Sequence, residues 1–329
     1  MAVQEKEIVK EQMKLLIGYD GSQCANAALD DLRRAGLPRE AQAIILSIFE
    51  QWLPHAGHNN LTEPISGASS SGSFTTMPTA VTTSAEKITE TRALALDAKL
   101  RLQAHFPDWD IKAEESAGSP AREILKRAAD WAPDLIAVGS QGCSGLGRFL
   151  LGSVSQKVAN EARCSVRVAR GTAWKEGAPV RILLALDGSP GSDAAVEAVR
   201  LRMWPPETEV RITTVIDRSN GPILTQMVSS AGGGVTSTAP HVWVQEFIDS
   251  AAKKLRGAAL LVSSKIEEGD PKSLIIANAE EWGAECIFVG ASYAHSSFER
   301  LLLGSVATAV VSRAHCSVEI VRGPPEPRL

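Results

Sequence analysis

Short apolar runs alternate with amphipathic stretches along most of the chain. Runs such as DLIAVGS and ECIFVGA are apolar without alternation, which is typical of parallel strands buried on both faces. In the first part of the chain, the predicted strands are 14–19, 43–49, 110–115, 134–138 and 165–169, and the predicted helices are 22–35, 85–105, 120–131 and 153–163. This alternation predicts an α/β fold with a doubly wound, mainly parallel, Rossmann-like sheet.

The same pattern occurs twice. The segment LLIGYDGSQCANAAL matches LLALDGSPGSDAAV, with Asp20 falling on Asp187. AGSPAREILKRAADWAPDLIAVGS matches EGDPKSLIIANAEEWGAECIFVGA, and LLGSVSQKVANEARCSVRVARG matches LLGSVATAVVSRAHCSVEIVRG. Three matches in the same order indicate a tandem duplication. We therefore predict two domains, 12–171 and 180–323, each with a five-stranded sheet.

Polar segments without periodicity separate some of these elements. A Ser/Thr/Gly-rich stretch at 57–84 predicts a long loop, and SSAGGGVTSTAP at 229–240 is its shorter equivalent in the second repeat. The polar segment TAWKEGAP at 172–179 joins the repeats. The sequence does not indicate the purpose of the long loop.

Composition narrows the class of protein. With 44% hydrophobic and 22% charged residues, the 329-residue chain is typical of soluble globular proteins. The net charge of −4 argues against nucleic acid as a partner. No apolar stretch is long enough to span a membrane, and the charged start MAVQEKEIVKEQMK differs from a signal peptide, so we expect a cytoplasmic protein.

Cysteine, histidine and tryptophan residues indicate packing rather than chemistry. The five cysteines are too dispersed for a disulfide framework, and no histidine has a metal-ligand spacing to Cys or Asp, so no metal site is predicted. Cys164 and Cys316 occupy equivalent positions and are interpreted as small buried residues rather than redox groups. Trp131 and Trp282, at matching helix ends, are interpreted as packing anchors.

The end of the fourth predicted strand carries the clearest chemical motif. Gly139 and Gly142 follow the strand, and after nine intervening residues Gly152 and Ser153 open a helix. Glycines let a backbone approach phosphates and permit positive φ, while a helix N-terminus attracts anions. Ser153 is placed either to cap the helix or to bond a phosphate oxygen. A plain Gly-rich turn with an ordinary Ser cap is the alternative. The spacing fits neither Walker A nor GxGxxG.

The spacing Gly139-x2-Gly142-x9-Gly152-Ser153 resembles the signature of the ATP-binding branch of the universal stress protein family. Asp20 after the first strand, the AGSP loop at 117–120 and the ending CSVRVAR are similar to the same family. The resemblance covers nearly the whole chain as two tandem domains. It implies a fold like that of the adenine nucleotide α-hydrolases, and it implies ATP binding by the first repeat.

The resemblance also assigns roles on the adenine side of the ATP. Asp20 would contact the ribose or adenine, and the main chain of Ile48 would hydrogen-bond adenine, with Val215 as its counterpart. For Asp20 the alternative is N-capping of the helix 22–35. Ile48 would in either case also be a buried strand residue.

On the phosphate side, the resemblance implies that Gly139 and Gly142 line the ribose and phosphates. Gly152 and Ser153 would hold the β- and γ-phosphates, and Ser155 on the first helical turn is a weaker candidate. Mg²⁺, or Mn²⁺, is expected to accompany the triphosphate.

The second repeat has a changed phosphate loop. Tyr293 stands where the second glycine is expected, the loop is one residue longer, and Glu299 adds negative charge. A side chain at this position opposes positive φ and fills phosphate space. We therefore expect about one tightly bound ATP per chain, although a longer loop that re-forms the cradle with His295 or Ser296 is the alternative. The equivalents that persist in the second repeat are Asp187, Val215, Gly290, Gly304 and Ser305.

The motif and the family resemblance together favour a nucleotide-binding stress-response protein in which bound ATP biases conformation or partner choice without efficient turnover, and no catalytic residue is predicted. A slow ATPase or adenine-nucleotide hydrolase, and a nucleotide-free scaffold, remain alternatives. No Ser-His-Asp pattern or positioned base is evident at the strand ends. The stress, the pathway and any protein partner are not indicated.

The last strand of each repeat predicts how the repeats assemble. SVRVAR at 165–170 and SVEIVR at 317–322 alternate and are β-branched, and exposed strand edges of this kind tend to be paired. Because such strands pair across a two-fold axis in the family, we predict a pseudo-dimer within one chain. A homodimer of chains is a further expectation by analogy alone.

Overall fold

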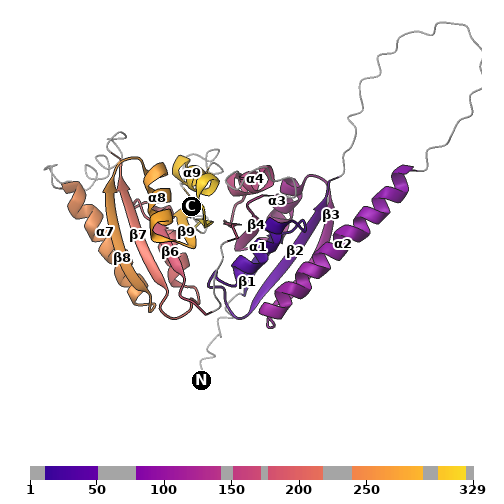
Figure 1. Ribbon diagram of the computed structural model, residues 1–329, viewed down its shortest axis with the longest axis horizontal. Coiled ribbons are helices and arrows are strands. Elements are labelled where there is room, and N and C mark those ends of the chain that lie inside the picture. The colour runs from indigo at the N-terminus through magenta and orange to yellow at the C-terminus, as the bar shows by residue number, and fades with distance from the viewer. Residues whose placement is uncertain are drawn as a thin grey trace, which may run out of the picture.

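A computed structural model describes residues 12–50, 79–141, 151–171, 177–217, 239–291 and 303–323 (Figure 1). The first half consists of β1 (Met13–Gly18), α1 (Gln23–Leu32), β2 (Ala41–Phe49), α2 (Thr79–His105), β3 (Asp110–Ala117), α3 (Pro120–Trp131), β4 (Leu135–Gly139), α4 (Ser153–Glu161) and β5 (Ser165–Ala169). The second half consists of β6 (Arg181–Ala185), α5 (Pro190–Arg200), β7 (Glu209–Ile216), α7 (Ala239–Arg256), β8 (Leu261–Glu268), α8 (Pro271–Trp282), β9 (Cys286–Gly290), α9 (Ser305–Arg313) and β10 (Ser317–Val321).

The predicted order of strands and helices is confirmed, with one clear difference in length. The sequence predicts a loop up to residue 84, but α2 begins at Thr79. Extending an existing helix adds one hydrogen bond for each residue ordered, which offsets the weak helix propensity of Thr and Ser. Residues 57–78 of the predicted loop lie outside the described residues, as do residues 51–56 before it and residues 218–238 before α7.

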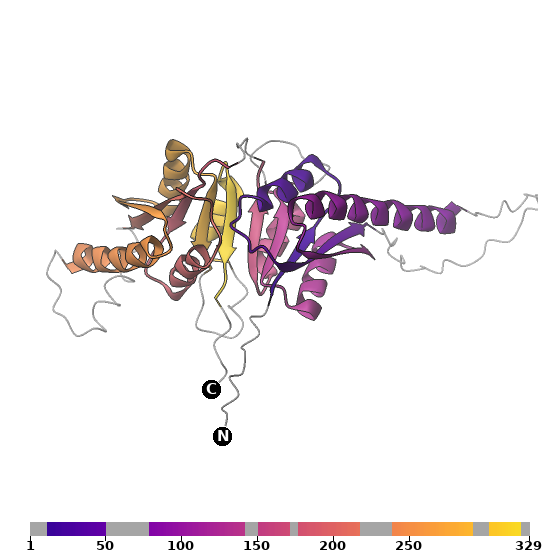
Figure 2. The ribbon, with the colours of Figure 1, turned by 90° about the horizontal axis from the view of Figure 1, so that it is seen from below.

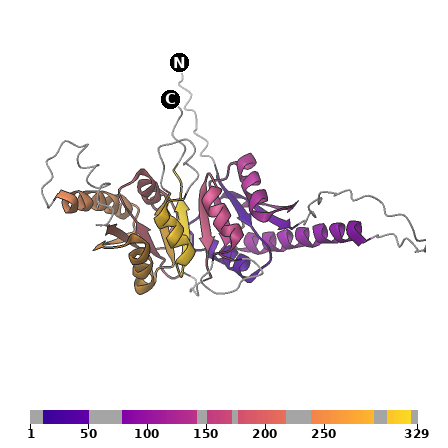
Figure 3. The same ribbon diagram turned by 90° about the horizontal axis from the view of Figure 1, so that it is seen from above.

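All ten strands form one sheet with the order β3-β2-β1-β4-β5-β10-β9-β6-β7-β8. Each half contributes five parallel strands, as predicted, and the only antiparallel pair among the described strands is β5 with β10. The predicted pairing of the two terminal strands is therefore confirmed. In Figure 3 these strands lie at the centre of the molecule, where the two halves meet. The bounds 12–171 and 180–323 for the two domains stay a prediction.

Helices cover both faces of the sheet. On one face, α3, α4, α8 and α9 pack over a core that continues across both halves and includes Val158, Val166, Val310 and Val318. On the other face, α1 and α2 cover the first half and α5 and α7 cover the second, each over its own core. The long helices α2 and α7 lie at opposite ends of the molecule (Figure 2). The shared core shows that the two halves pack as one body.

The junction is nearly two-fold symmetric. The backbone N–H of Arg170 donates to Ser317 Oγ at 3.0 Å, and that of Arg322 donates to Ser165 Oγ at 3.1 Å. At the centre of the ladder, Arg167 faces Glu319. Arg167 and Glu319 occupy equivalent positions in the two repeats, so the repeats carry opposite charges at the point where β5 and β10 pair.

No helix in the described ranges is both long and apolar enough to cross a membrane.

Candidate functional site

The strand order places a ligand-binding crevice in each half. In the first half the order reverses between β1 and β4, which are hydrogen-bonded neighbours, and in the second half it reverses between β6 and β9. Ligands of such sheets bind beyond the carboxyl ends of the strands at this switch point. Of the candidate site residues, Asp20 follows β1 and Gly139 ends β4, as predicted from their positions in the sequence. These are the two strands at the switch point of the first half.

The turn between β1 and α1 places Asp20 at this edge. Asp20 Oδ1 accepts from the backbone N–H of Ser22 at 3.0 Å, and the intervening Gly21 has φ +76°. The cap of α1 is Ser22, whose Oγ accepts from the N–H of Ala25 at 3.1 Å. The alternative in which Asp20 caps this helix is therefore wrong. Its side chain is exposed to solvent at the switch point.

Gly139 is required for a reason that the sequence does not reveal. It lacks the positive φ that its type suggested. A Cβ at this position would lie 2.8 Å from the carbonyl carbon and oxygen of Cys24, at the start of α1. Contacts this short do not occur in folded proteins. Close packing of a helix backbone on the end of β4 therefore demands glycine, with or without a ligand.

The start of α4 is tied to the end of β4. Ser155 is buried, and its Oγ donates to the carbonyl oxygen of Gly139 at 2.6 Å. The N–H of Gly152 donates to the carbonyl of Ser140 at 2.8 Å. The first free N–H groups of α4 are thus held beside the switch point, which is the arrangement that binds anions.

One interpretation of this loop changes, that of the residue that caps α4. Gly152, with φ −67° and ψ 153°, is the N-cap of α4, and no side chain caps the helix. Ser153 is the first helical residue and is exposed, so the interpretation of Ser153 as the cap is wrong. Gly142 lies outside the described residues.

Ile48 lies near the end of β2, one strand away from the switch point. Its side chain is half-buried against the shared core, as expected for a strand residue. Its register partner on β3 is Ser116, whose Oγ donates to Glu123 Oε2 at 2.9 Å. The sequence did not single out this polar pair. Asp20, Ile48, Gly139 and the start of α4 therefore share one edge of the sheet.

The second half repeats the frame but differs in detail. Asp187 accepts from the N–H of Ser189 at 2.9 Å, as Asp20 does from Ser22. Gly304 is the N-cap of α9, Ser305 is exposed and Val215 is half-buried. Tyr293, His295, Ser296 and Glu299 lie outside the described residues.

The two halves differ in two details near the strand end at the switch point. A Cβ on Gly290 would lie 2.2 Å from the carbonyl carbon of Gly191, so the equivalent helix packs even more closely than α1 does on Gly139. Ala307 stands at the position of Ser155 and has no hydroxyl to bond the strand end. The start of α9 therefore lacks the side-chain tie that α4 has.

Cys316 is buried and Trp131 and Trp282 pack on the core, as predicted, whereas Cys164 is only partly buried. Burial raises the pKa of Cys164 to about 11 and that of Cys286 to about 12, which keeps both thiols protonated and unreactive near neutral pH. Trp131 and Trp282 pack on the shared core beneath Arg127 and Arg211 respectively. Within the described residues, no three His, Cys, Asp or Glu side chains gather as a metal site requires.

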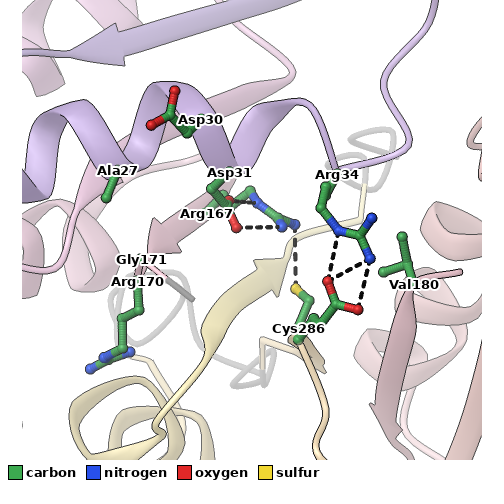
Figure 4. Close-up of a pocket in the computed structure, with 10 residues that line it drawn as sticks. Ala27, Asp30, Asp31, Arg34, Arg167, Arg170, Gly171, Val180 and Cys286 are labelled. Atoms are coloured by element: carbon green, nitrogen blue, oxygen red, sulfur yellow. Dashed lines mark hydrogen bonds and ion pairs between the residues drawn. The ribbon is translucent and has the colours of Figure 1, made fainter. Parts of the chain in front are cut away.

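A charged pocket lies at the junction of the halves (Figure 4). Arg167, 1% exposed, donates to Asp31 at 2.5 Å and to Cys286 Sγ at 3.3 Å. Burial lowers the pKa of Arg167, but the Asp31, Cys286 and Glu319 side chains outweigh it, so the pKa is raised and the guanidinium stays charged. Because these charges already pair with one another, the pocket holds the halves together rather than offering groups to a ligand.

Comparisons with known proteins agree with this fold. The model of the universal stress protein family matches residues 65–170 and 180–322. YxiE, a universal stress protein of Bacillus subtilis, is 29% identical over 157 residues, which cover 48% of this chain and 98% of that protein. A universal stress protein of Mycolicibacterium smegmatis is 27% identical over 227 residues, covering 64% of this chain and 69% of that protein.

A solved structure extends the likeness to nearly the whole chain. The crystal structure of a universal stress protein from Archaeoglobus fulgidus has a TM-score of 0.60 and 21% identity, covering 94% of this chain and 98% of that one. At this identity the likeness concerns the fold. Since the family model matches both halves, and most of the chain, the chain belongs to the universal stress protein family.

Proposed function

We propose that the chain is a stress-response protein that binds ATP at the switch point of its first half and acts as a nucleotide-dependent regulatory or interaction module. The observation that carries the proposal is the bond from Ser155 Oγ to the Gly139 carbonyl. It holds a helix N-terminus against the strand end at the crevice where ligands of this fold bind. The family assignment supports a role in the stress response.

The residues at this edge fit a nucleotide. Ile48 would supply main-chain hydrogen bonds to adenine, and Asp20 would accept from the ribose or base. The N–H groups that begin at Ser153 would hold the phosphates, together with Gly142 of the motif. Asp20 is an exposed carboxylate, and the described residues hold no cluster of metal ligands. Mg²⁺ would therefore be held chiefly by the phosphates and water, as it commonly is.

The first test asks whether the protein carries a nucleotide. Purified protein is denatured by heat, and the released small molecules are identified by chromatography and mass spectrometry. Release of ATP in a ratio of about one per chain supports the proposal. If wild-type protein neither releases a nucleotide nor binds added ATP in calorimetry, the chain is a nucleotide-free scaffold.

A matched pair of variants tests which half binds. Ser153 and Ser305 are both exposed first residues of their helices. A glutamate there favours the helix through its dipole and repels phosphates, so Ser153→Glu and Ser305→Glu should both fold. We expect Ser153→Glu to weaken ATP binding at least about tenfold in calorimetry, and Ser305→Glu to leave it unchanged. Two equal sites, or loss with Ser305→Glu alone, would show that the wrong half is assigned.

The same pair separates binding from turnover. Release of phosphate from labelled ATP by wild type, above the rate of Ser153→Glu, would favour the slow ATPase instead. Equal background rates support a protein that binds ATP without efficient hydrolysis.

A further inference from the structure

Each terminal strand is followed by an arginine that reaches into the other half. Arg322 follows β10 of the second half, and its Nη2 donates to the carbonyl of Ala159 at 2.6 Å. Its Nη1 donates to the carbonyl of Cys164 at 3.2 Å. Ala159 is in the last turn of α4, and Cys164 lies just before β5, so both acceptors belong to the first half.

Arg170 makes the mirror set of contacts. It follows β5 of the first half, and its Nη2 donates to the carbonyl of Val311 at 2.7 Å, in the last turn of α9. Its Nη1 donates to the carbonyl of Cys316 at 3.5 Å. Arg170 and Arg322 therefore form a reciprocal clamp, in which each half supplies a cation to the helix end of the other.

These contacts suit the helix ends chemically. The last carbonyls of a helix have no partner within it, and they carry the negative end of the helix dipole. A guanidinium satisfies such carbonyls and compensates the dipole. The clamp thus fixes the C-termini of α4 and α9, the two helices whose N-termini face the switch points.

In the first half, α4 is held at both ends by different halves of the molecule. Its start is tied to the first half through Ser155 and Gly152, and its end is tied to the second half through Arg322. Because α4 has only nine residues, a shift at one end changes the direction of the whole helix. The N–H groups at its start move with it.

We propose that Arg322 is a positioning residue for the nucleotide of the first half, so that a residue of the second half sets the phosphate affinity of the first. This inference rests on the proposed ATP site. It makes the junction part of the binding apparatus, and by linkage a bound nucleotide in turn stabilises the junction.

The test uses Arg322→Gln and its matched control Arg170→Gln in the full chain. Both variants remove one guanidinium from the same junction, at positions related by the duplication, and each leaves one helix end without its partner. ATP affinity is measured by calorimetry, and backbone hydrogen exchange is followed in α4 and α9. Thermal unfolding of both variants reports any general loss of stability.

We expect Arg322→Gln to weaken ATP binding about fivefold and to speed exchange in α4, whereas Arg170→Gln speeds exchange in α9 and leaves ATP affinity unchanged. Arg322→Lys, which keeps the charge and part of the donor set, should recover part of the affinity. Equal weakening by both glutamine variants, or no weakening by Arg322→Gln, would overturn the proposal, because the role would then be general stability.

Two other outcomes are separable. Weakening by Arg170→Gln alone would overturn the role of Arg322 and place the nucleotide in the second half. If wild type binds no ATP, the proposed function fails and the role of Arg322 in binding fails with it. Exchange in α4 then still decides whether Arg322 anchors that helix.

Discussion

In the first half, a buried hydroxyl ties the start of α4 to the end of β4; in the second half, Ala307 leaves the start of α9 without that tie. Both halves nevertheless keep a glycine at the strand end, Gly139 and Gly290, because a Cβ would collide with the neighbouring helix in each. Retention of this glycine is therefore no evidence that the second half binds nucleotide. After duplication, shared residues can reflect packing alone, and the residues that differ are the more informative about binding.

The halves also differ where they meet. Arg167 and Glu319 occupy equivalent positions and face one another on the β5–β10 ladder. Nη1 of Arg167 lies 3.1 Å from Oε2 of Glu319. Glu319 also forms an ion pair with Arg202, and Arg167 also forms an ion pair with Asp31. Two identical halves would bring like charges together at this position. The divergence of this one pair makes the first half complementary to the second rather than to itself.

The largest expected effect comes from breaking this pair. Arg167→Met leaves Asp31 without its cation in the junction and leaves the buried Glu319 with Arg202 alone, and we expect a loss of about 3 to 5 kcal/mol in the free energy of unfolding. Denaturation in guanidinium chloride measures it. Arg181→Met, which breaks the exposed pair with Glu209, should change stability by less than about 1 kcal/mol. Comparable losses in the two variants would contradict the importance of the junction charges.

The loss of stability on replacing a strand-end glycine by alanine should be larger where the neighbouring helix packs more closely. Gly290→Ala places a Cβ 2.2 Å from the Gly191 backbone, whereas Gly139→Ala places one 2.8 Å from the Cys24 backbone. We expect Gly290→Ala to cost about 3 kcal/mol and Gly139→Ala about 1 to 2 kcal/mol, as overpacked sites do. Urea denaturation of both variants checks the order. The reverse order would mean that α1 has less freedom to shift than α5.

Loss of the hydrogen bond from the Ser155 hydroxyl to the end of β4 should have a smaller effect on stability. Ser155→Ala removes one buried hydrogen bond and should cost about 1 kcal/mol in unfolding free energy, and release of the start of α4 should lower ATP affinity severalfold. Ala307→Ser, at the equivalent position, should leave ATP affinity unchanged. Calorimetry and denaturation measure both. Equal ATP affinities for wild type and Ser155→Ala would show that the tie serves stability only.

The smallest effect depends on pH. In the first half, Arg127 hydrogen-bonds Glu114 through both carboxylate oxygens, at 2.7 and 2.9 Å, and lowers its pKa from the ordinary 4.5. The second half has Lys265 and Asn278 at these positions.

A lowered carboxyl pKa stabilises the fold above the ordinary value, and this gain is lost as pH falls through the folded pKa. The pair is partly exposed, so we expect Arg127→Met to cost only about 0.5 kcal/mol at pH 7, with the difference from wild type fading below about pH 4.5. Denaturation midpoints across pH 3 to 7 measure it. A difference that persists at pH 3 would point to lost packing on Trp131 instead.

The fold could be predicted from the sequence because its main signals are local or repeated. Buried parallel strands appear as continuous apolar runs, and the duplication fixes equivalent positions, so the succession of strands and helices along the chain follows. The pairing of the terminal strands was expected from the family resemblance. The packing of Gly139 on Cys24 could not be predicted, because it depends on how closely a helix approaches a strand 115 positions away. The clamp was missed for a similar reason: Arg322 bonds a carbonyl 163 positions earlier, and main-chain acceptors leave no trace in residue types. The one signal of the clamp in the sequence is that an arginine follows the terminal strand of each repeat.

The antiparallel joint has a consequence for synthesis. β10 begins 152 positions after β5, so at ordinary translation speeds roughly ten to thirty seconds separate the two strands at the ribosome. During that interval the edge of β5 has no partner from its own chain, while neighbouring ribosomes on one messenger expose the same edge. Two β5 strands meeting in the native register would bring Arg167 against Arg167, a like-charge encounter in an apolar setting. We therefore expect the charge that later binds Glu319 to disfavour pairing between unfinished copies of the chain in this register.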